Sequence, residues 1–431
     1  MQPEGVPPEP DTIFALSSGA PPAAIAVIRI SGPQADAALS ALAGSLPKPR
    51  RARLAVLRRG EDELDRALVQ RFPGPHSATG EDIVELHLHG GRSVVAAVEA
   101  ALAALPGLRR AEPGEFTRRA FANGRIDLAE AEGLADLLQA ETESQRRAAL
   151  ALAGGALSRQ IEAWRLRLLD LSAEVESAID FSDEGDVAAL PPGFAAGLTE
   201  LKDELAGWLE RPAAERLKEG IRLVVAGPPN SGKSTLVNAL SGRDVAITSE
   251  IAGTTRDLIE APTALAGTPF LLVDTAGLRA SGDRIEAIGV ARAEASLEAA
   301  DLILWLGDPD LAPDLARTIL VHAKADLDAP DSRADLAVSA FTGAGMAGLI
   351  DQVLSRARAL LPGEGEVALH RRHRAILQEV VDYLGESTVS ADPVVQAELL
   401  RGARGLLDRI TGRAGVEDVL DTLFARFCIG K

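Results

Sequence analysis

The octapeptide GPPNSGKS at residues 227–234 constrains the fold of this chain more than any other feature. It fits the pattern G-x-x-x-x-G-K-[ST], in which glycines permit a tight loop whose backbone N–H groups surround phosphate. An apolar, β-branched run at residues 221–226 precedes it, and helically spaced apolar residues follow it: Leu236, Val237 and Leu240. A strand, such a loop and a helix together predict a nucleotide-binding P-loop within a mostly parallel α/β domain.

The side chains within this loop suit phosphate and Mg²⁺. Lys233 would place its ammonium group against the β- and γ-phosphates, and the Ser234 hydroxyl would bind Mg²⁺. The helix that begins here would direct backbone N–H groups at the same phosphates. A glycine-rich turn that fits the pattern by chance is the alternative, but such a turn requires neither the preceding strand nor the following helix.

Four further segments follow in the order expected of a GTPase. GTTRD (253–257) offers a Thr hydroxyl to Mg²⁺, and DTAG (274–277) ends an apolar run, so that Asp274 can bind Mg²⁺ through water and the Gly277 N–H can contact the γ-phosphate. AKAD (323–326) stands where a GTPase keeps its guanine-reading Asn-Lys-x-Asp, and SA (339–340) stands at the last base-contacting loop. Each segment is a weak signal alone, but the whole series in this order indicates a GTPase.

Two positions depart from the usual GTPase pattern. Ala323 replaces the Asn of the guanine-reading motif, while Asp326 keeps the carboxylate that accepts hydrogen bonds from the guanine N1–H and amine. Loss of one neutral hydrogen bond, about 0.5–1.5 kcal/mol, predicts weaker nucleotide binding with guanine preference retained. Leu278 stands where many GTPases have a water-orienting Gln. Asn230, as a ligand of a monovalent cation, and Glu286, as a water-orienting group, are candidate replacements; a loop-stabilising Asn and a solvated helical Glu are the alternatives.

The rest of the chain divides into an α/β segment and two helical segments. Apolar runs at residues 25–30 and 82–89 predict strands, the second with alternating faces, and residues 93–105 predict a helix. Between residues 128 and 181, and again after 366, apolar residues recur at three- and four-residue steps, with a predicted break at the Gly154-Gly155 pair. We therefore predict a multidomain α/β plus α protein, with an N-terminal α/β domain (1–120), a helical domain in two halves (121–217 and 366–431) and a doubly wound α/β domain (218–365) inserted between them.

Composition narrows the compartment and the partners. The formal net charge of −18 argues against a general nucleic-acid coat protein, and the single cysteine, Cys428, excludes an intrachain disulfide and favours a reducing compartment. The longest apolar stretches fall below the roughly 18 residues that a membrane span requires. The acidic, proline-rich N-terminus is unlike a signal peptide. We expect a cytoplasmic protein that is not inserted in a membrane.

Several other stretches resemble the MnmE (TrmE) family of tRNA-modification GTPases, over nearly the whole chain. They are DTI (11–13), IAVIRISG (25–32), TGED (79–82), PGEFT (113–117), residues 123–132, and ITGR (410–413) followed by the terminal FCIGK (427–431). The resemblance implies an N-terminal tetrahydrofolate-binding and dimerisation domain, a discontinuous helical-bundle domain and an inserted Ras-like G domain.

The resemblance also implies an activity. It implies potassium-dependent GTP hydrolysis driven by G-domain dimerisation, in a homodimer that joins the FAD-dependent protein MnmG in a heterotetramer or larger complex. In this family the two proteins add a carboxymethylaminomethyl or aminomethyl group to C5 of the wobble uridine of tRNA. The one-carbon unit comes from 5,10-methylene- or formyl-tetrahydrofolate.

The family's functional residues can be placed on this sequence position by position. The resemblance assigns catalysis to Glu286, Asn230 and Lys233. It assigns Mg²⁺ binding to Ser234 and Thr255, and K⁺ binding to Asn230, Ser249, Ile251 and Thr254. Tetrahydrofolate binding is assigned to Arg29, Glu85, Lys431 and Arg125. The family commonly has Lys at the position of Arg125. Nucleotide contacts fall to Asn230, Ser231, Gly232, Lys233, Ser234, Thr235, Ser249, Glu250, Ile251, Ala252, Gly253, Thr254, Thr255, Asp274, Thr275, Ala276, Gly277, Lys324, Asp326, Ser339 and Ala340.

Simpler interpretations stay open for some of these residues. Arg29 and Glu85 would form a cross-strand ion pair without any ligand, and Cys428 is more simply a small apolar residue than a nucleophile. His87 and His89 share one strand face, but no third metal ligand is evident. The basic run 370–374, with Arg401, Arg404, Arg409 and Arg413, could contact RNA phosphates or form a solvated helix face. For the whole chain, the alternatives are a ribosome-assembly or signalling GTPase and a folate-binding scaffold with a weakened nucleotide site.

Overall fold

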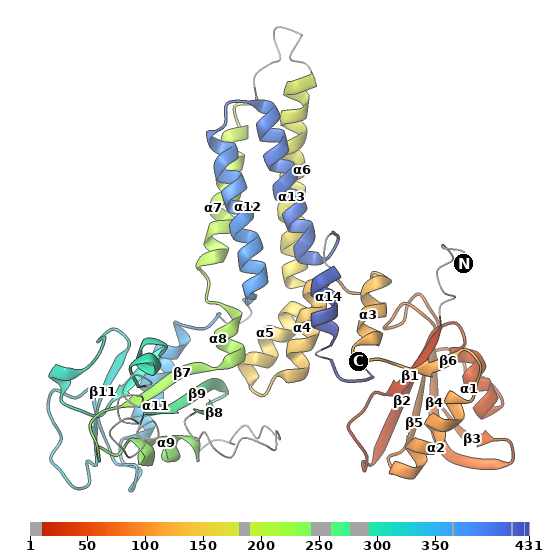
Figure 1. The fold of residues 1–431 in the computed structure, drawn as a ribbon, viewed down its shortest axis with the longest axis horizontal. Helices are drawn as coiled ribbons and strands as arrows, with labels where there is room; N and C mark the ends of the chain where they lie inside the picture. Colours follow the sequence, from red (N-terminus) through yellow and green to blue (C-terminus); the bar gives the residue numbers. More distant parts are fainter. Residues whose placement is uncertain are drawn as a thin grey trace, which may run out of the picture. The chain divides into compact units, whose positions relative to one another are not determined.

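The structure is a computed structural model that describes residues 11–180, 190–242, 260–275, 293–363, 366–414, 417–425 and 427–430. The chain forms two compact units. The first holds the described residues up to Ala135 and those from Thr411 onward, and the second holds Asp136–Ile410. Figure 1 traces the chain through both units.

A six-stranded sheet forms the centre of the first unit, with the strand order β3-β4-β5-β2-β1-β6. Neighbouring strands are antiparallel except β1 and β6, which are parallel. The strands are β1 Thr12–Leu16, β2 Ile25–Ser31, β3 Arg53–Arg59, β4 Asp62–Phe72, β5 Ile83–His89 and β6 Leu108–Arg110. The helices of this unit are α1 Ala35–Ala43, α2 Arg92–Ala103, α3 Glu115–Ala122 and α14 Glu417–Phe424, together with the first part of α4 Leu128–Gln139.

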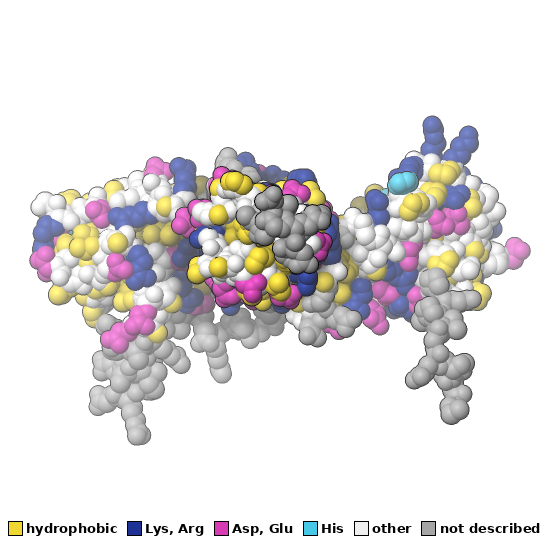
Figure 2. Space-filling view, turned by 90° about the horizontal axis from the view of Figure 1, so that it is seen from above, with side chains coloured by type: hydrophobic (Ala, Val, Ile, Leu, Met, Phe, Trp, Pro, Cys, Tyr) yellow, Lys and Arg dark blue, Asp and Glu magenta, His cyan; other side chains and the backbone are white. Residues whose placement is uncertain are grey.

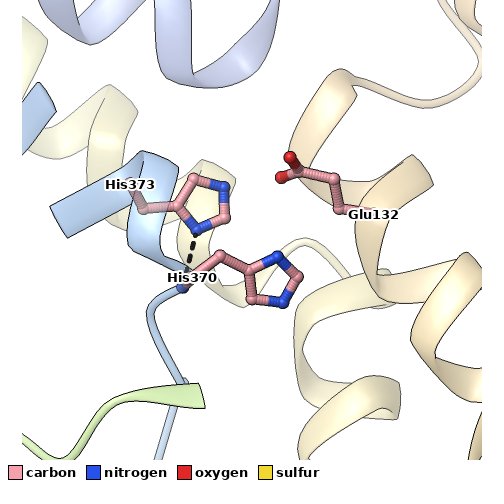
Figure 3. A group of neighbouring side chains, drawn as sticks. All are labelled: Glu132, His370 and His373. Carbon is pink, nitrogen blue, oxygen red and sulfur yellow. Dashed lines mark hydrogen bonds between the residues drawn. The ribbon is translucent and has the colours of Figure 1, made fainter. Parts of the chain in front are cut away.

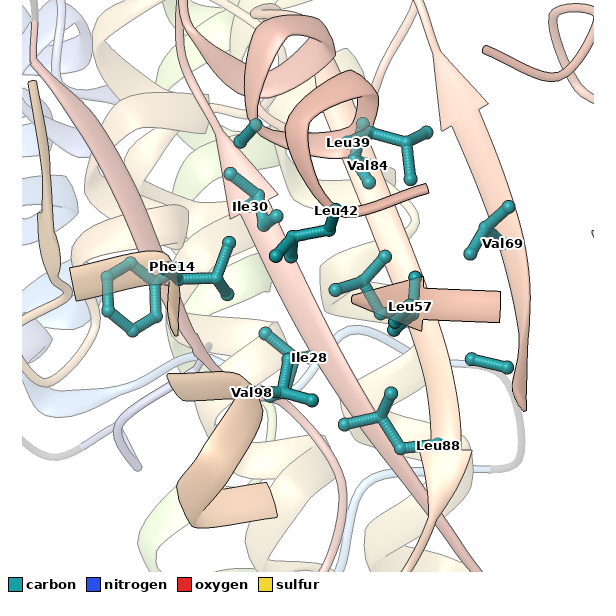
Figure 4. Close-up of a cluster of buried hydrophobic side chains, with 14 of the residues drawn as sticks. Phe14, Ile28, Ile30, Leu39, Leu42, Leu57, Val69, Val84, Leu88 and Val98 are labelled. Carbon is teal, nitrogen blue, oxygen red and sulfur yellow. The ribbon is translucent and has the colours of Figure 1, made fainter. Parts of the chain in front are cut away.

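One face of this sheet carries the hydrophobic core. Alternate residues of β2 and β5 are buried against α1 and α2, among them Ile28, Ile30 and Leu88, with Leu39 and Val98 supplied by the helices (Figure 4). The predicted alternation along residues 82–89 is therefore confirmed, because Val84, Leu86 and Leu88 are buried while Glu85 and His87 are only partly so. The opposite face carries the polar side chains of Arg29, Glu85 and His87 along β2 and β5, and near β1 it carries a second apolar cluster with Ile13 and Phe116.

The C-terminal segment packs within the same unit. Helix α14 lies against α3 and α4, where Phe424 contacts the ring of Phe121 with 6.5 Å between ring centroids. Beyond α14, Ile429 forms an antiparallel bridge with Pro113. Gly430 is so close to β1 that a Cβ there would collide with the carbonyl oxygen of Leu16. The final residues therefore end beside the central sheet.

A helical bundle makes up one part of the second unit. Its helices are α5 Glu143–Ala153, α6 Ala156–Asp180, α7 Phe194–Glu210, α8 Ala214–Glu219, α12 Arg371–Val389 and α13 Pro393–Thr411, and α7 packs along both α6 and α12 (Figure 1). The predicted break at Gly154-Gly155 is confirmed, because it separates α5 from α6. Trp164 is fully buried in the bundle, and its indole N–H donates to Glu204 Oε1 at 2.8 Å.

The other part of this unit is a six-stranded, mostly parallel sheet with the order β12-β11-β10-β7-β9-β8. Only β8 is antiparallel to its neighbour. The elements are β7 Ile221–Ala226, α9 Lys233–Ser241, β8 Glu260–Leu265, β9 Thr268–Asp274, β10 Leu302–Trp305, β11 Thr318–Ala323, β12 Leu336–Val338 and α11 Met346–Arg358. Helices α9 and α11 cover one face, and a second apolar cluster around Val224 and Ile303 covers the other, as a parallel sheet requires.

This α/β part is inserted in the helical part, as predicted, and the two connecting segments pair with each other. Ala213, on the way in, forms a parallel bridge with Leu369, on the way out, and the Ala214 N–H donates to the Leu369 carbonyl at 3.1 Å. Next to this bridge, the carboxylate of Asp136 pairs with Lys218 at 2.9 Å and with His370 at 2.7 Å. These three residues lie far apart in the sequence, so no local pattern predicts the cluster.

Among the described residues, none of the helices is both long enough and apolar enough to cross a membrane.

Candidate functional site

The loop between β7 and α9 adopts a conformation that requires its glycines. Gly227 has φ +148°, and a Cβ there would lie 2.9 Å from the backbone of Leu306. Gly232, immediately before α9, has φ +100°. Both values are ones that side-chain-bearing residues rarely adopt, so the two fixed glycines of the motif are explained by the backbone. Asn230 also has a positive φ, +62°, a conformation that Asn tolerates better than most residues.

Lys233 and Ser234 stand at the start of α9. The Lys233 side chain is buried and folds back over the loop, donating to the carbonyl oxygens of Gly227 at 3.0 Å and Pro228 at 2.7 Å. Its ammonium group is thus held at the mouth of the loop. Ser234 is exposed in the first turn of the same helix. Positive charge, a hydroxyl and the helix N-terminus therefore converge, which is the donor set that a phosphate–Mg²⁺ group needs.

Asp274 lies at the adjacent strand end. It is the last residue of β9, it pairs in register with Val225 of β7, and it is largely buried. The next residue, Thr275, fixes this end of the strand, because its hydroxyl donates to the Val225 carbonyl at 2.9 Å. A carboxylate next to the P-loop strand suits Mg²⁺, which prefers oxygen ligands and keeps several waters.

The predicted base-reading segment follows β11, two strands from β7. Lys324 has φ +60°, and its ammonium group donates to the Asn230 carbonyl at 2.6 Å. Asp326 is exposed, with a carboxylate available to a base. Ser339 is buried at the end of β12, where its hydroxyl accepts from the Thr342 N–H at 3.1 Å. The structure therefore brings the described parts of the predicted nucleotide site to the carboxyl edge of one parallel sheet, where ligands of such sheets bind.

The remaining predicted residues of this site lie outside the described part of the chain. They are the segment 249–255, with the proposed Mg²⁺ ligand Thr255 and the K⁺ ligands Ser249, Ile251 and Thr254, and the positions Ala276, Gly277, Leu278 and Glu286. Of the catalytic candidates, the structure describes Asn230 and Lys233.

A second candidate site occupies the polar face of the first unit's sheet. Arg29 of β2 and Glu85 of β5 are paired in register, and both Nε and Nη2 of the arginine donate to Glu85 Oε1, at 3.0 and 2.8 Å. The guanidinium carbon also lies 5.9 Å from the ring centroid of Phe116 on α3. The ion pair that we considered as an alternative to ligand binding is therefore present, but it leaves Glu85 Oε2 uncommitted to the arginine.

Polar groups of the loop before β5 border this face. The hydroxyls of Ser31 and Thr79 lie 2.7 Å apart, and Ser31 also donates to Glu81 Oε2 at 2.7 Å. Arg125, between α3 and α4, donates through Nε to the Ser77 carbonyl at 3.1 Å. Arg125 is thus anchored to this loop.

The C-terminal tail reaches the same sheet at the end of β1. Cys428 is exposed, while its neighbours Phe427 and Gly430 are buried. Lys431 lies outside the described residues, directly after the glycine that touches Leu16. The last described residue of the tail, Gly430, therefore lies against the end of β1, which pairs with β2, the strand of Arg29.

Two histidines that the sequence placed on one strand face have different surroundings. The ring of His89 is mostly exposed, and its Nδ1 lies 2.7 Å from Asp65 Oδ1. His87 is partly buried, and its Nε2 lies 3.6 Å from Glu85 Oε2. The predicted alternation places both histidines correctly but cannot reveal that their neighbours differ.

Two arginines of the basic run 370–374, which we considered as a phosphate-contacting or solvated face, instead donate to backbone carbonyls. Arg372 donates to the Arg409 and Ile410 carbonyls, both at 3.0 Å, and Arg374 donates to the carbonyls of Arg211 and Leu209. His373 is fully buried and accepts from the His370 N–H at 3.3 Å through Nδ1 (Figure 3). These side chains hold the start of α12 in place. On the face drawn in Figure 2, basic and acidic side chains are interspersed.

Comparison with known proteins agrees with the motifs. The family described as GTP-binding protein TrmE N-terminus matches residues 12–125, and the one described as MnmE helical domain matches residues 128–428. The tRNA modification GTPase MnmE of Rhizorhabdus wittichii is 60% identical over 427 residues, covering 98% of this chain and 97% of that protein. The protein of the same name from Erythrobacter litoralis is 59% identical over 423 residues, covering 98% of this chain and 100% of that protein.

Among solved structures, the G domain of the T. maritima FeoB iron transporter is 25% identical and covers 32% of this chain and 98% of its own, with a TM-score of 0.24, which is too low to add to the assignment. The matches along the whole chain, together with a P-loop, Asp274 and Lys324-x-Asp326 at one sheet edge, show that this chain belongs to the MnmE family of tRNA modification GTPases.

Proposed function

We propose that this protein is a potassium-dependent GTPase that acts in modification of the wobble uridine of tRNA. With the FAD-dependent partner MnmG, it would add a carboxymethylaminomethyl or aminomethyl group to C5 of that uridine, using a one-carbon unit of 5,10-methylene- or formyl-tetrahydrofolate. The observation that carries the GTPase part is the meeting of Lys233, Ser234, Asp274 and Asp326 at one sheet edge in a chain of this family.

The described residues of the nucleotide site support this proposal. The Lys233 ammonium, held against the P-loop carbonyls, would neutralise charge on the β- and γ-phosphates. Ser234, with Thr255, would bind Mg²⁺, and Asp274 would hold it through water. Asp326 would accept hydrogen bonds from guanine, with Lys324, Ser339 and Ala340 around the base. The other nucleotide contacts expected from the sequence belong to the same proposal.

Two parts of catalysis need a replacement for the usual residue: the orientation of the attacking water and the neutralisation of charge in the transition state. Leu278 cannot orient water, so this function falls to Glu286. A potassium ion supplies positive charge against the phosphates when bound, as an arginine finger does in other GTPases. We assign it to Asn230 with Ser249, Ile251 and Thr254, and we expect dimerisation of G domains to complete the site. Asn230 fits a ligand role because its side chain is exposed while its own carbonyl is engaged by Lys324.

The polar sheet face is the proposed tetrahydrofolate site. Glu85 offers a carboxylate oxygen that Arg29 leaves uncommitted, and Arg125 is anchored beside the same strands. Lys431 would complete the set from the tail. The three-domain division expected from the sequence, a cytoplasmic homodimer formed through the N-terminal domain, and a heterotetramer or larger complex with MnmG are parts of this proposal.

The test of the GTPase proposal is steady-state GTP hydrolysis in KCl and in NaCl at equal ionic strength. Strong stimulation by potassium, lost in Asn230→Ala, is the expected result. Asn238→Ala is a suitable control, because Asn238 is exposed on α9 and is assigned neither to the nucleotide nor to an ion. Equal, slow rates in both salts would remove the potassium mechanism, and absence of hydrolysis would favour the scaffold alternative.

A further inference from the structure

His87 carries a buried nitrogen without a partner. Its ring lies on β5, the middle of the polar sheet face, in register with Val27 of β2 and Leu68 of β4. The ring is 28% exposed, yet Nε2 is buried and has no hydrogen-bond partner within the described part of the chain. Most buried polar atoms in native proteins are hydrogen-bonded, so such an atom calls for an explanation.

Glu85 Oε2 lies 3.6 Å from this nitrogen, which is too long for a hydrogen bond. Glu85 is already fixed by two hydrogen bonds from Arg29, and both go to its other oxygen, Oε1. Within the residues that the structure describes, Oε2 accepts no hydrogen bond. An acceptor oxygen and a nitrogen that can donate therefore lie 3.6 Å apart on this face of the sheet.

We propose that His87 Nε2 and Glu85 Oε2 together read the lactam edge of the pterin ring, with His87 donating to the ring carbonyl and Glu85 accepting from the adjacent ring N–H. The proposal rests on the proposed function of this face as a tetrahydrofolate site. A planar amide presents one donor and one acceptor next to each other, which is the complement of this pair. A 4-amino pterin opposes this pair at both positions, because its amino group gives the His87 donor no acceptor and its N3 carries no hydrogen for Glu85. His87 is then the residue that reads the 4-position.

His89 offers a matched control on the same strand. It lies two residues along, on the same face, but its Nδ1 is engaged by Asp65 Oδ1 and its ring is 73% exposed. If both histidines only support the strand, replacing either one should affect ligand affinity equally. If His87 reads the pterin, replacing His87 should weaken binding and replacing His89 should not.

The experiment is calorimetric titration of the full-length protein with 5-formyltetrahydrofolate and with its 4-amino-4-deoxy analogue. The parent protein is expected to prefer the 4-oxo compound. His87→Leu is expected to bind 5-formyltetrahydrofolate roughly 2- to 13-fold more weakly, the value of one hydrogen bond, and to lose the part of the preference that the contact to the 4-carbonyl supplies. His87→Gln, whose amide can donate from a similar position, is expected to keep the preference, and His89→Gln is expected to match the parent.

The possible failures are distinguishable. If the parent protein binds neither compound, the tetrahydrofolate site itself is wrong and the role of His87 falls with it. If the parent binds and Glu85→Gln weakens binding, while His87→Leu keeps both affinity and preference, only the role of His87 is refuted. Equal losses in His87→Leu and His87→Gln would identify a packing role and also refute it. Thermal unfolding of each variant shows whether a loss of affinity reflects a loss of fold.

Discussion

Replacing Ala323 with Asn is expected to tighten guanine-nucleotide binding. Ala323 is the last residue of β11, and a methyl group placed on Gly232 of the P-loop would lie 3.8 Å from the Ala323 Cβ. An Asn amide extends beyond Cβ far enough to cross that distance, so it can donate to the P-loop or to the nucleotide. One added neutral hydrogen bond is worth about 0.5–1.5 kcal/mol, which corresponds to roughly 2- to 13-fold in the dissociation constant at 25 °C.

The assay is a fluorescence titration with N-methylanthraniloyl-GDP, repeated with unlabelled GDP as competitor. Ala323→Leu is the matched control, because Leu has the same number and branching of side-chain heavy atoms as Asn and cannot form a hydrogen bond. Tighter binding in the Asn variant alone supports the reasoning. Unchanged or weaker binding in Ala323→Asn would refute it, and equal tightening by Leu would show that filled volume, and not a hydrogen bond, is what the parent lacks.

Three further expectations follow from described residues. Asp326→Asn is expected to weaken GTP binding at least tenfold and to favour XTP, because the 2-oxo group of XTP can accept a hydrogen bond from the Asn amide. Competition titrations with both nucleotides measure this preference, and a variant that still preferred GTP would contradict the expectation. Burial tends to raise the pKa of Asp136, but hydrogen bonding and charge from His370 and Lys218 outweigh it and lower that pKa below its usual 3.8. The stabilising effect of ionised Asp136 is therefore complete above pH 3.8 and is lost as the pH falls through the lowered pKa. Asp136→Asn should reduce the free energy of unfolding by about 1.5–3 kcal/mol at pH 7 and by less at pH 3. An equal reduction at both pH values in urea titrations would contradict this. Trp164→Ala should cost about 3–5 kcal/mol in the same measurement, and Trp164→Phe less, because the ring volume is mostly kept.

The sequence predicts those features that depend on residues close together in the chain. Alternation along β5, the helical spacing of α6 and the glycines of the P-loop are local, and each is set by backbone geometry or by one buried face. The same reasoning places Asp274 and Asp326 at strand ends, so their meeting at one edge follows once the sheet is known to be parallel.

Features that depend on distant partners could not be predicted in this way. The run 370–374 is basic in composition, but Arg372 and Arg374 donate to carbonyls that end other helices, and those carbonyls are invisible in a local pattern. His87 and His89 have the same spacing signal, and only the register of β5 with its neighbours separates the ring paired with Asp65 from the ring whose buried nitrogen has no hydrogen-bond partner among the described residues. Composition gives the sign of a charge but not the atom that faces it.

The paired connections of the inserted domain limit its degrees of freedom. A domain joined by one segment can rotate about every single bond of that segment. Here the segments at Ala213 and Leu369 run side by side, and the Arg371 N–H also donates to Glu215 Oε1 at 2.6 Å, so twisting one segment would break the bonds to the other. Bending of the pair as a whole is the soft motion that remains. Because each domain then has less orientational entropy to lose, bringing two such domains together in the proposed dimer costs less free energy.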